Sequence, residues 1–204
     1  MTTPANMRPT ALGLIVLGML MEQPMHVYRM QKLIKERGKD KVVNVRQRTS
    51  LHQVIDRLTA HGLVEQIGPR DAPENYPGRR VYGITPAGRQ AAIDWLTAMI
   101  TEMPDEFPQF PAALSVLTMV DPDTAAGLIS ARIATIESIL NGLRSEQAGL
   151  HVPRIYLLED EYRTRSLEAE SAWLAEILHD IHEGLLSWNA PDASPHDPEG
   201  EQKC

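Results

Sequence analysis

The chain has 204 residues and a formal net charge of −7, a length that allows one large domain or two modest ones. Its single cysteine is the last residue, Cys204, which excludes an internal disulfide or a cysteine-rich metal site and is typical of a reducing compartment. The longest apolar stretch, Leu12 to Met21, is too short to cross a bilayer and lacks the cleavage site of a signal peptide. We therefore expect a cytoplasmic protein that does not enter a membrane.

Charge is distributed unevenly along the chain. Residues 1–100 carry 14 Lys or Arg and 8 Asp or Glu, a net +6, whereas residues 101–204 carry 6 and 19, a net −13. Between residues 26 and 48, eight basic side chains stand against only Glu36 and Asp40, which creates a field that attracts a phosphate backbone. A basic first half and an acidic second half predict two tasks on one chain. Charge alone, however, also fits a simpler interpretation of the basic run over residues 26–48, as a solvated helix face.

The basic half is predicted to begin with a flexible arm over residues 1–10, which contains two prolines. A helix that is apolar on nearly all sides follows over residues 11–21 and stops before Pro24. A second helix is predicted over residues 26–37 and ends at Gly38. Its apolar stripe consists of Val27, Met30, Leu33 and Ile34.

A third helix is predicted to start at Thr49 or Ser50, either of which can cap it, and to close at Gly62. Apolar residues recur at helical spacing on what must be its inner face. These residues are Leu51, Val54, Ile55 and Leu58. The outer face is polar, so this helix can be anchored on one side and bind a ligand with the other.

Two β-rich runs follow, over residues 63–67 and 80–84. The connection between them is rich in proline and glycine, so the pair is predicted to form a hairpin with an extended tip. Thr85 and Pro86 then start a fourth helix, with the threonine as N-cap and the proline at the first helical position. This helix is predicted to run to about residue 100.

The acidic half, residues 102–188, is predicted to be helical. One helix begins after Asp121 and Pro122 and carries an apolar seam that needs a partner helix. The seam consists of Ile129, Ile133, Ile136, Leu140 and Leu143. A final helix is predicted over residues 153–188, roughly 50 Å long at the usual rise per residue. Residues 189–204 are rich in Pro, Asp and Glu and are predicted to be a disordered tail.

The order of these elements predicts a mainly α fold with an N-terminal winged helix-turn-helix over residues 11–101 and a helical dimerisation domain after it. In a helix-turn-helix, the second helix lies in the major groove of DNA and its first turns meet the bases. The base-reading candidates are Ser50, Gln53 and Arg57, since glutamine pairs with adenine and arginine with guanine or phosphate. The candidates for DNA backbone contacts are Tyr28, Lys32, Arg46, Arg48, Thr49, His52, Arg70, Arg79 and Arg80.

Residues 79–89 contain an Arg-x-Tyr-x-x-Thr-x-x-Gly run after the hairpin, and residues 23–28, 49–58 and 61–65 carry further short motifs. With these four segments the first half resembles the PadR-type winged-helix regulators, which usually have tyrosine where His52 stands. Histidine can still donate to a phosphate. The second half resembles the longer subgroup of that family, with a helical C-terminal dimerisation domain. The resemblance implies a homodimer that binds an inverted-repeat operator on double-stranded DNA, usually as a repressor relieved by a small molecule.

A dimer suits this function because two recognition helices about 34 Å apart match successive major grooves. We therefore assign much of the final helix to the dimer interface and the seam over residues 129–143 to packing within the chain. The interface candidates are Trp173, Leu174, Ile177, Leu178, Ile181 and Leu185. Trp95 and Met99 lie on the helix that follows the hairpin. In compact members of the family an aromatic residue on that helix lines a drug pocket, so both residues are candidates for a hydrophobic effector pocket. The simpler interpretation of Trp95 is a core residue.

No cofactor, metal or catalytic residue is expected. A close set of carboxylates and histidines on the final helix fits a solvated acidic face better than a metal site. This set consists of Glu176, His179, His182 and Glu183. Motifs for phosphate-binding loops, zinc hydrolases and nucleophile elbows are absent from the sequence. The alternative function is a winged-helix protein-interaction module that does not bind DNA, against which the basic run over residues 26–48 argues.

Overall fold

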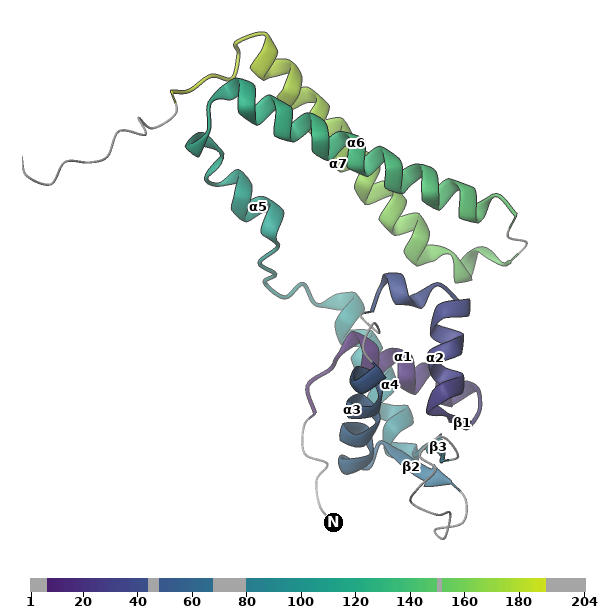
Figure 1. Cartoon of the computed structure of the whole chain (residues 1–204). Helices are drawn as coiled ribbons and strands as arrows, with labels where there is room; N and C mark the ends of the chain where they lie inside the picture. Colours follow the sequence, from purple (N-terminus) through teal and green to yellow (C-terminus); the bar gives the residue numbers. More distant parts are fainter. Residues whose placement is uncertain (1–6, 44–47, 68–79, 150–151, 190–204) are drawn as a thin grey trace, which may run out of the picture. The chain divides into compact units, whose positions relative to one another are not determined.

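A computed structural model of the chain describes residues 7–43, 48–67, 80–149 and 152–189, and the side chains of residues 48 and 49 lie outside this description. The chain divides into two compact units, residues 1–105 and 106–204 (Figure 1). Among the described residues, no helix combines the length and apolar character needed to span a bilayer.

Three helices begin the first unit. α1 covers Ala11–Glu22, and the Thr10 side chain caps it by accepting a hydrogen bond from the Gly13 amide at 3.1 Å. α2 covers Val27–Glu36, and Gly38 follows it with a left-handed backbone at φ 66°. A 3₁₀ turn follows at Lys39–Lys41, and α3 covers Arg48–Ala60.

A three-stranded antiparallel sheet joins the helices. Its strands are β1 (Met25–His26), β2 (Val64–Ile67) and β3 (Val81–Ile84), in the spatial order β1-β3-β2. β2 and β3 are the two strands of the predicted hairpin. β1 was not predicted, because Met25 and His26 were assigned to the approach and start of the second helix. Met25 instead pairs with Tyr82, and the helix starts one residue later.

α4 covers Pro86–Thr101, with the Thr85 side chain as its N-cap and Pro86 in the first turn, as the sequence predicts. α1 packs against α3, α4 and β3 and so forms the centre of the first unit. The largest fully buried side chains of its core come from α1, β1, α2, α3 and β2. They are Leu17, Leu20, Met25, Met30, Ile34, Ile55, Leu58, Val16 and Val64.

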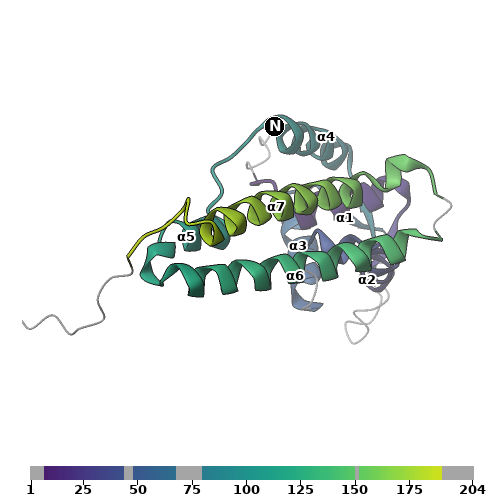
Figure 2. The same cartoon turned by 90° about the horizontal axis from the view of Figure 1, so that it is seen from above.

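The second unit is built on two long helices that lie side by side (Figure 2). After α5 (Gln109–Leu114), α6 covers Pro122–Gln147 and α7 covers Leu158–His182. The predicted seam on α6 meets α7, because Ile129, Ile136 and Leu140 share one buried cluster with residues of the last helix. Trp188 fixes the chain after α7 by donating its indole N–H to the Val120 carbonyl at 2.7 Å.

The last helix is shorter than predicted. The prediction began it at Pro153, but residues 154–156 form a 3₁₀ turn and α7 starts only at Leu158. The helix ends at His182, and Gly184 follows with a left-handed φ of 69°. Its 25 residues span about 37 Å rather than 50 Å. Gly184 lies two residues after the last residue of α7, and a glycine there terminates a helix readily because it adopts the left-handed conformation without strain.

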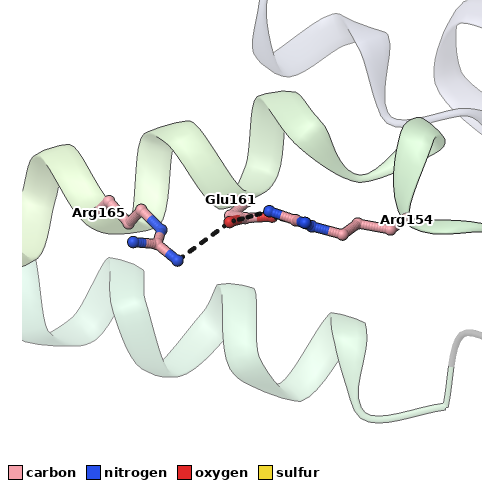
Figure 3. Close-up of polar contacts among 3 residues, drawn as sticks. All are labelled: Arg154, Glu161 and Arg165. Atoms are coloured by element: carbon pink, nitrogen blue, oxygen red, sulfur yellow. Dashed lines mark hydrogen bonds and ion pairs between the residues drawn. The ribbon is translucent and has the colours of Figure 1, made fainter.

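The start of α7 is organised by charge. Figure 3 shows Glu161 between two arginines: its carboxylate accepts two hydrogen bonds of 2.9 Å from Arg154 and lies 3.1 Å from the Arg165 guanidinium. The hydrogen bonds from Arg154 hold the pKa of Glu161 below its ordinary value. An acidic residue in the first turn also suits the positive end of the helix dipole.

Candidate nucleic-acid interface

α3 is anchored by one face and open on the other. Leu51, Ile55 and Leu58 are buried in the core of the first unit, while Gln53 and Arg57 are exposed and Ser50 is half-buried. The three predicted base readers therefore lie together on the outer face. They line a shallow groove with further residues of α1 and α3, namely Leu12, Val54 and Asp56.

The end of α3 is held by two sets of hydrogen bonds. The Gly62 amide donates to Thr59 and the Leu63 amide donates to Leu58, both at 2.9 Å, which is the Schellman arrangement that closes a helix. The hydroxyl of Thr85 then donates to the Gly62 carbonyl at 2.7 Å. Because Thr85 also caps α4, the orientation of α3 is coupled directly to the start of the next helix.

The described candidates for backbone contacts are exposed. Tyr28, Lys32, His52 and Arg80 all lie at the surface of the first unit, with Tyr28 67% exposed. Lys32 is 3.4 Å from Glu36 one turn later, an exposed ion pair that a phosphate can replace at little cost. The remaining candidates fall outside the described residues or side chains. They are Arg46, Arg48, Thr49, Arg70 and Arg79.

Not every basic residue between 26 and 48 is available for DNA. Arg37 donates two hydrogen bonds, of 2.6 and 2.7 Å, to the carboxylate of Glu22 and so joins the ends of α1 and α2. This pairing keeps the pKa of Glu22 below its ordinary value. Arg37 therefore has a structural partner, which charge counting along the sequence does not reveal.

Trp95 has the position expected of a core residue. It is only 7% exposed, and its ring lies so close to Gly13 of α1 that a Cβ there would be 2.9 Å from the ring. Met99, one turn later on α4, is 40% exposed. The two candidates for an effector pocket thus have different environments.

The candidates for a dimer interface divide into two groups. Leu174 is fully buried and Ile181 is 7% exposed, both against α6 of the same chain, and Ile177 and Leu178 are half-buried at the edge of that cluster. Within this chain α6 covers Leu174 and Ile181, and their part in a dimer interface stays a prediction. The seams of α6 and α7 pair with each other. Trp173, at 42% exposed, and Leu185, at 75%, remain accessible.

Within the part of the chain that the structure describes, no group of three or more histidine, cysteine or acidic side chains is arranged to hold a metal ion. The histidines and carboxylates near the end of α7 therefore do not form such a group. The surface that the structure brings together is instead the outer face of α3, where Ser50, Gln53, Asp56 and Arg57 line one groove.

Three helices, a sheet with two hairpin strands, and a helix after the hairpin define a winged-helix protein. The sequence of residues 16–93 matches the model of the Transcriptional regulator PadR-like family. Over these residues the chain is therefore similar to the PadR-like family of transcriptional regulators, which confirms the predicted resemblance and the predicted mainly α, winged-helix fold.

Solved structures share this fold over most of the chain. The PadR of Bacillus subtilis in complex with operator DNA is 18% identical, with a TM-score of 0.65, and the match covers 84% of this chain and 99% of that one. The same protein in complex with p-coumaric acid has a TM-score of 0.67 at 17% identity, with 85% and 99% covered.

The virulence activator AphA of Vibrio cholerae has a TM-score of 0.66 at 16% identity, and the match covers 85% of this chain and 99% of AphA. No curated protein sequence matches this chain significantly. At these identities the structural matches establish the fold, and the family model establishes a similarity over residues 16–93.

Proposed function

We propose that this chain is a homodimeric, sequence-specific DNA-binding regulator that reads an inverted-repeat operator with α3. One observation carries the proposal: α3 buries three apolar side chains in the core and presents Ser50, Gln53 and Arg57 together on its exposed face. A helix can enter the major groove only if one face is anchored and the other offers hydrogen-bonding groups. The Bacillus subtilis neighbour was solved on operator DNA, which supports this proposal.

Each base-reading residue has a role that its chemistry suggests. Gln53 can donate to and accept from adenine at once, and Arg57 can donate to guanine or to a phosphate. Ser50 is short and lets the helix approach the bases. Tyr28, Lys32, His52 and Arg80 are exposed and supply the contacts to phosphates that set position without reading sequence. We extend this role to Arg46, Arg48, Thr49, Arg70 and Arg79.

A homodimer follows from the symmetry of such operators, since two copies of α3 must reach successive major grooves about 34 Å apart. Trp173 and Leu185 are the exposed apolar side chains near the end of the chain that we assign to the interface. The dimer acts in the cytoplasm as a repressor relieved by a small hydrophobic effector. The p-coumaric acid complex of the Bacillus subtilis neighbour supports the effector.

The proposal is tested by gel shifts of the full chain on the DNA upstream of its own gene, at several salt concentrations. We expect Gln53→Ala to relax the preference for operator over random DNA, and Arg80→Ala to weaken both and to lower the salt dependence. Arg89→Ala is the matched control, because Arg89 is an exposed arginine on α4. An equal loss on operator and random DNA in both variants would contradict the assigned roles. Failure of the wild type to shift any DNA would favour a protein-interaction module.

A further inference from the structure

An acidic residue lies in the middle of the proposed DNA-reading face. Asp56 is exposed on α3 and lines the same groove as Gln53 and Arg57. Asp56 follows Gln53 by three residues, which places their Cβ atoms about 5–6 Å apart on one side of a helix. Since the buried residues Leu51, Ile55 and Leu58 define the opposite side, Asp56 points away from the core as directly as Gln53 does.

The Asp56 carboxylate has no ion pair or hydrogen bond with any residue that the structure describes. Arg57 is its neighbour in sequence, but side chains one residue apart on a helix do not face each other. A bare carboxylate brought near DNA is repelled by the phosphates, because both are negatively charged. Its presence on this face therefore weakens binding to every sequence that does not offer it a hydrogen-bond donor.

The major groove offers such a donor at cytosine. Cytosine presents its N4 amino group there, and aspartate accepts a hydrogen bond from that group. Adenine also presents an amino group, but its N7 acceptor lies beside it and repels a second acceptor. Guanine and thymine present acceptors, which a carboxylate cannot use. Among the four bases, cytosine is thus the best partner for Asp56.

We infer that Asp56 is a specificity-determining residue that selects a cytosine next to the base read by Gln53. The spacing supports adjacent base pairs, since the two side chains start about 5–6 Å apart and successive bases rise about 3.4 Å. This inference rests on the proposed function, because it requires α3 to lie in the major groove. Asp56 thus joins Ser50, Gln53 and Arg57 as a base-reading residue, and its negative charge opposes binding to DNA in general while it favours one base.

The test is a selection of bound sequences from random double-stranded DNA, with full-length wild type, Asp56→Ala and Asp56→Asn. We expect the wild type to prefer cytosine at one position of each half-site by about tenfold, within the range of a good base contact. Asp56→Ala should reduce this preference to less than about twofold and leave the other positions unchanged. Asp56→Asn should change it from cytosine to adenine, because asparagine pairs with both adenine groups.

The matched control is Asp94→Asn, which removes the same charge from an exposed helix position on α4 and should leave every base preference unchanged. Variants of Asp56 that bind all DNA more tightly with unchanged preferences would overturn the inference, because Asp56 would then only repel phosphate. Unchanged affinity and unchanged preferences would overturn it too. A wild type without any base preference would refute the proposed function itself. If the wild type is selective and the Asp56 variants keep the same base preferences, this inference alone is refuted.

Discussion

Gly88 in the first turn of α4 lies against the main chain of Leu63, so closely that a Cβ at position 88 would overlap the Leu63 carbonyl oxygen. Thr85 strengthens the same junction, because its hydroxyl donates to the carbonyls of Gly62 and Leu63 and accepts from the Gly88 amide. The Thr-x-x-Gly spacing thus has a physical reason. The threonine joins the end of α3 to α4, and the glycine leaves room for the contact.

Replacing this glycine should destabilise the first unit. In Gly88→Ala the added methyl group meets backbone atoms that cannot rotate away, so we expect a loss of roughly 1–3 kcal/mol in the free energy of unfolding, as for other overpacked sites. Urea denaturation followed by circular dichroism measures the change. Gly18→Ala is the control, since Gly18 lies within α1 with open space around it and alanine there should stabilise by about 0.5–1 kcal/mol. The same effect from both substitutions would rule out the steric explanation.

The hydroxyl of Thr85 should be measurable separately from its methyl group. Thr85→Val keeps the shape and removes the cap of α4 together with the bond to Gly62, so we expect a loss of about 0.5–2 kcal/mol. Thr85→Ser keeps the hydroxyl and should retain most of the stability. Because the bond to Gly62 holds the end of α3, Thr85→Val should also weaken operator binding at a temperature where the protein stays folded. Equal stability of the two variants would show that the hydroxyl contributes nothing.

Local sequence signals predicted the elements that depend on neighbouring residues. The caps at Thr85 and Asp121 and the apolar stripe of α3 are read within one or two turns, and all of them appear in the structure. β1 could not be predicted in this way, because two residues form a strand only through pairing with β3, more than fifty residues later. Pairing over such a separation leaves no mark in the local pattern.

The partner of an apolar seam was equally hard to predict. Periodicity shows that Leu174 and Ile181 need a covering helix, but it does not distinguish α6 of the same chain from a second copy. The structure assigns both to α6. Asp56 could have been found from the sequence, since it follows Gln53 by three residues.

The ion pair between Glu22 and Arg37 should make stability depend on pH in the acid range. Hydrogen bonds from Arg37 lower the pKa of Glu22 in the folded chain, so the pair stabilises the fold above the ordinary glutamate value of about 4.5 and loses its effect as pH falls through the lowered value. Both side chains are nearly half exposed, so we expect a contribution of about 1 kcal/mol or less.

Glu22→Gln measures this contribution. We expect the variant to be less stable than the wild type at pH 7 and the difference to shrink towards zero as pH falls through the lowered pKa of Glu22, below which Glu22 is protonated in both states. Urea denaturation at a series of pH values checks it, and 1 M salt at pH 7 should reduce the difference because the pair is exposed. A difference that persists unchanged at low pH would mean that the amide substitution acts through packing instead.

Trp95 and Trp173 should respond to substitution in opposite ways. Trp95 is buried against Gly13, so Trp95→Ala should reduce the free energy of unfolding by about 3–5 kcal/mol at any protein concentration. Trp173 is 42% exposed on α7, so Trp173→Ala should affect a single folded chain much less. If Trp173 belongs to the dimer interface, the variant should instead dissociate at higher concentration than the wild type in analytical ultracentrifugation. Its melting temperature should then depend less on concentration than that of the wild type, because association stabilises only the folded chain and the weaker dimer is less populated. Unchanged dissociation of Trp173→Ala would remove this residue from the interface and leave Leu185 as the exposed candidate to test.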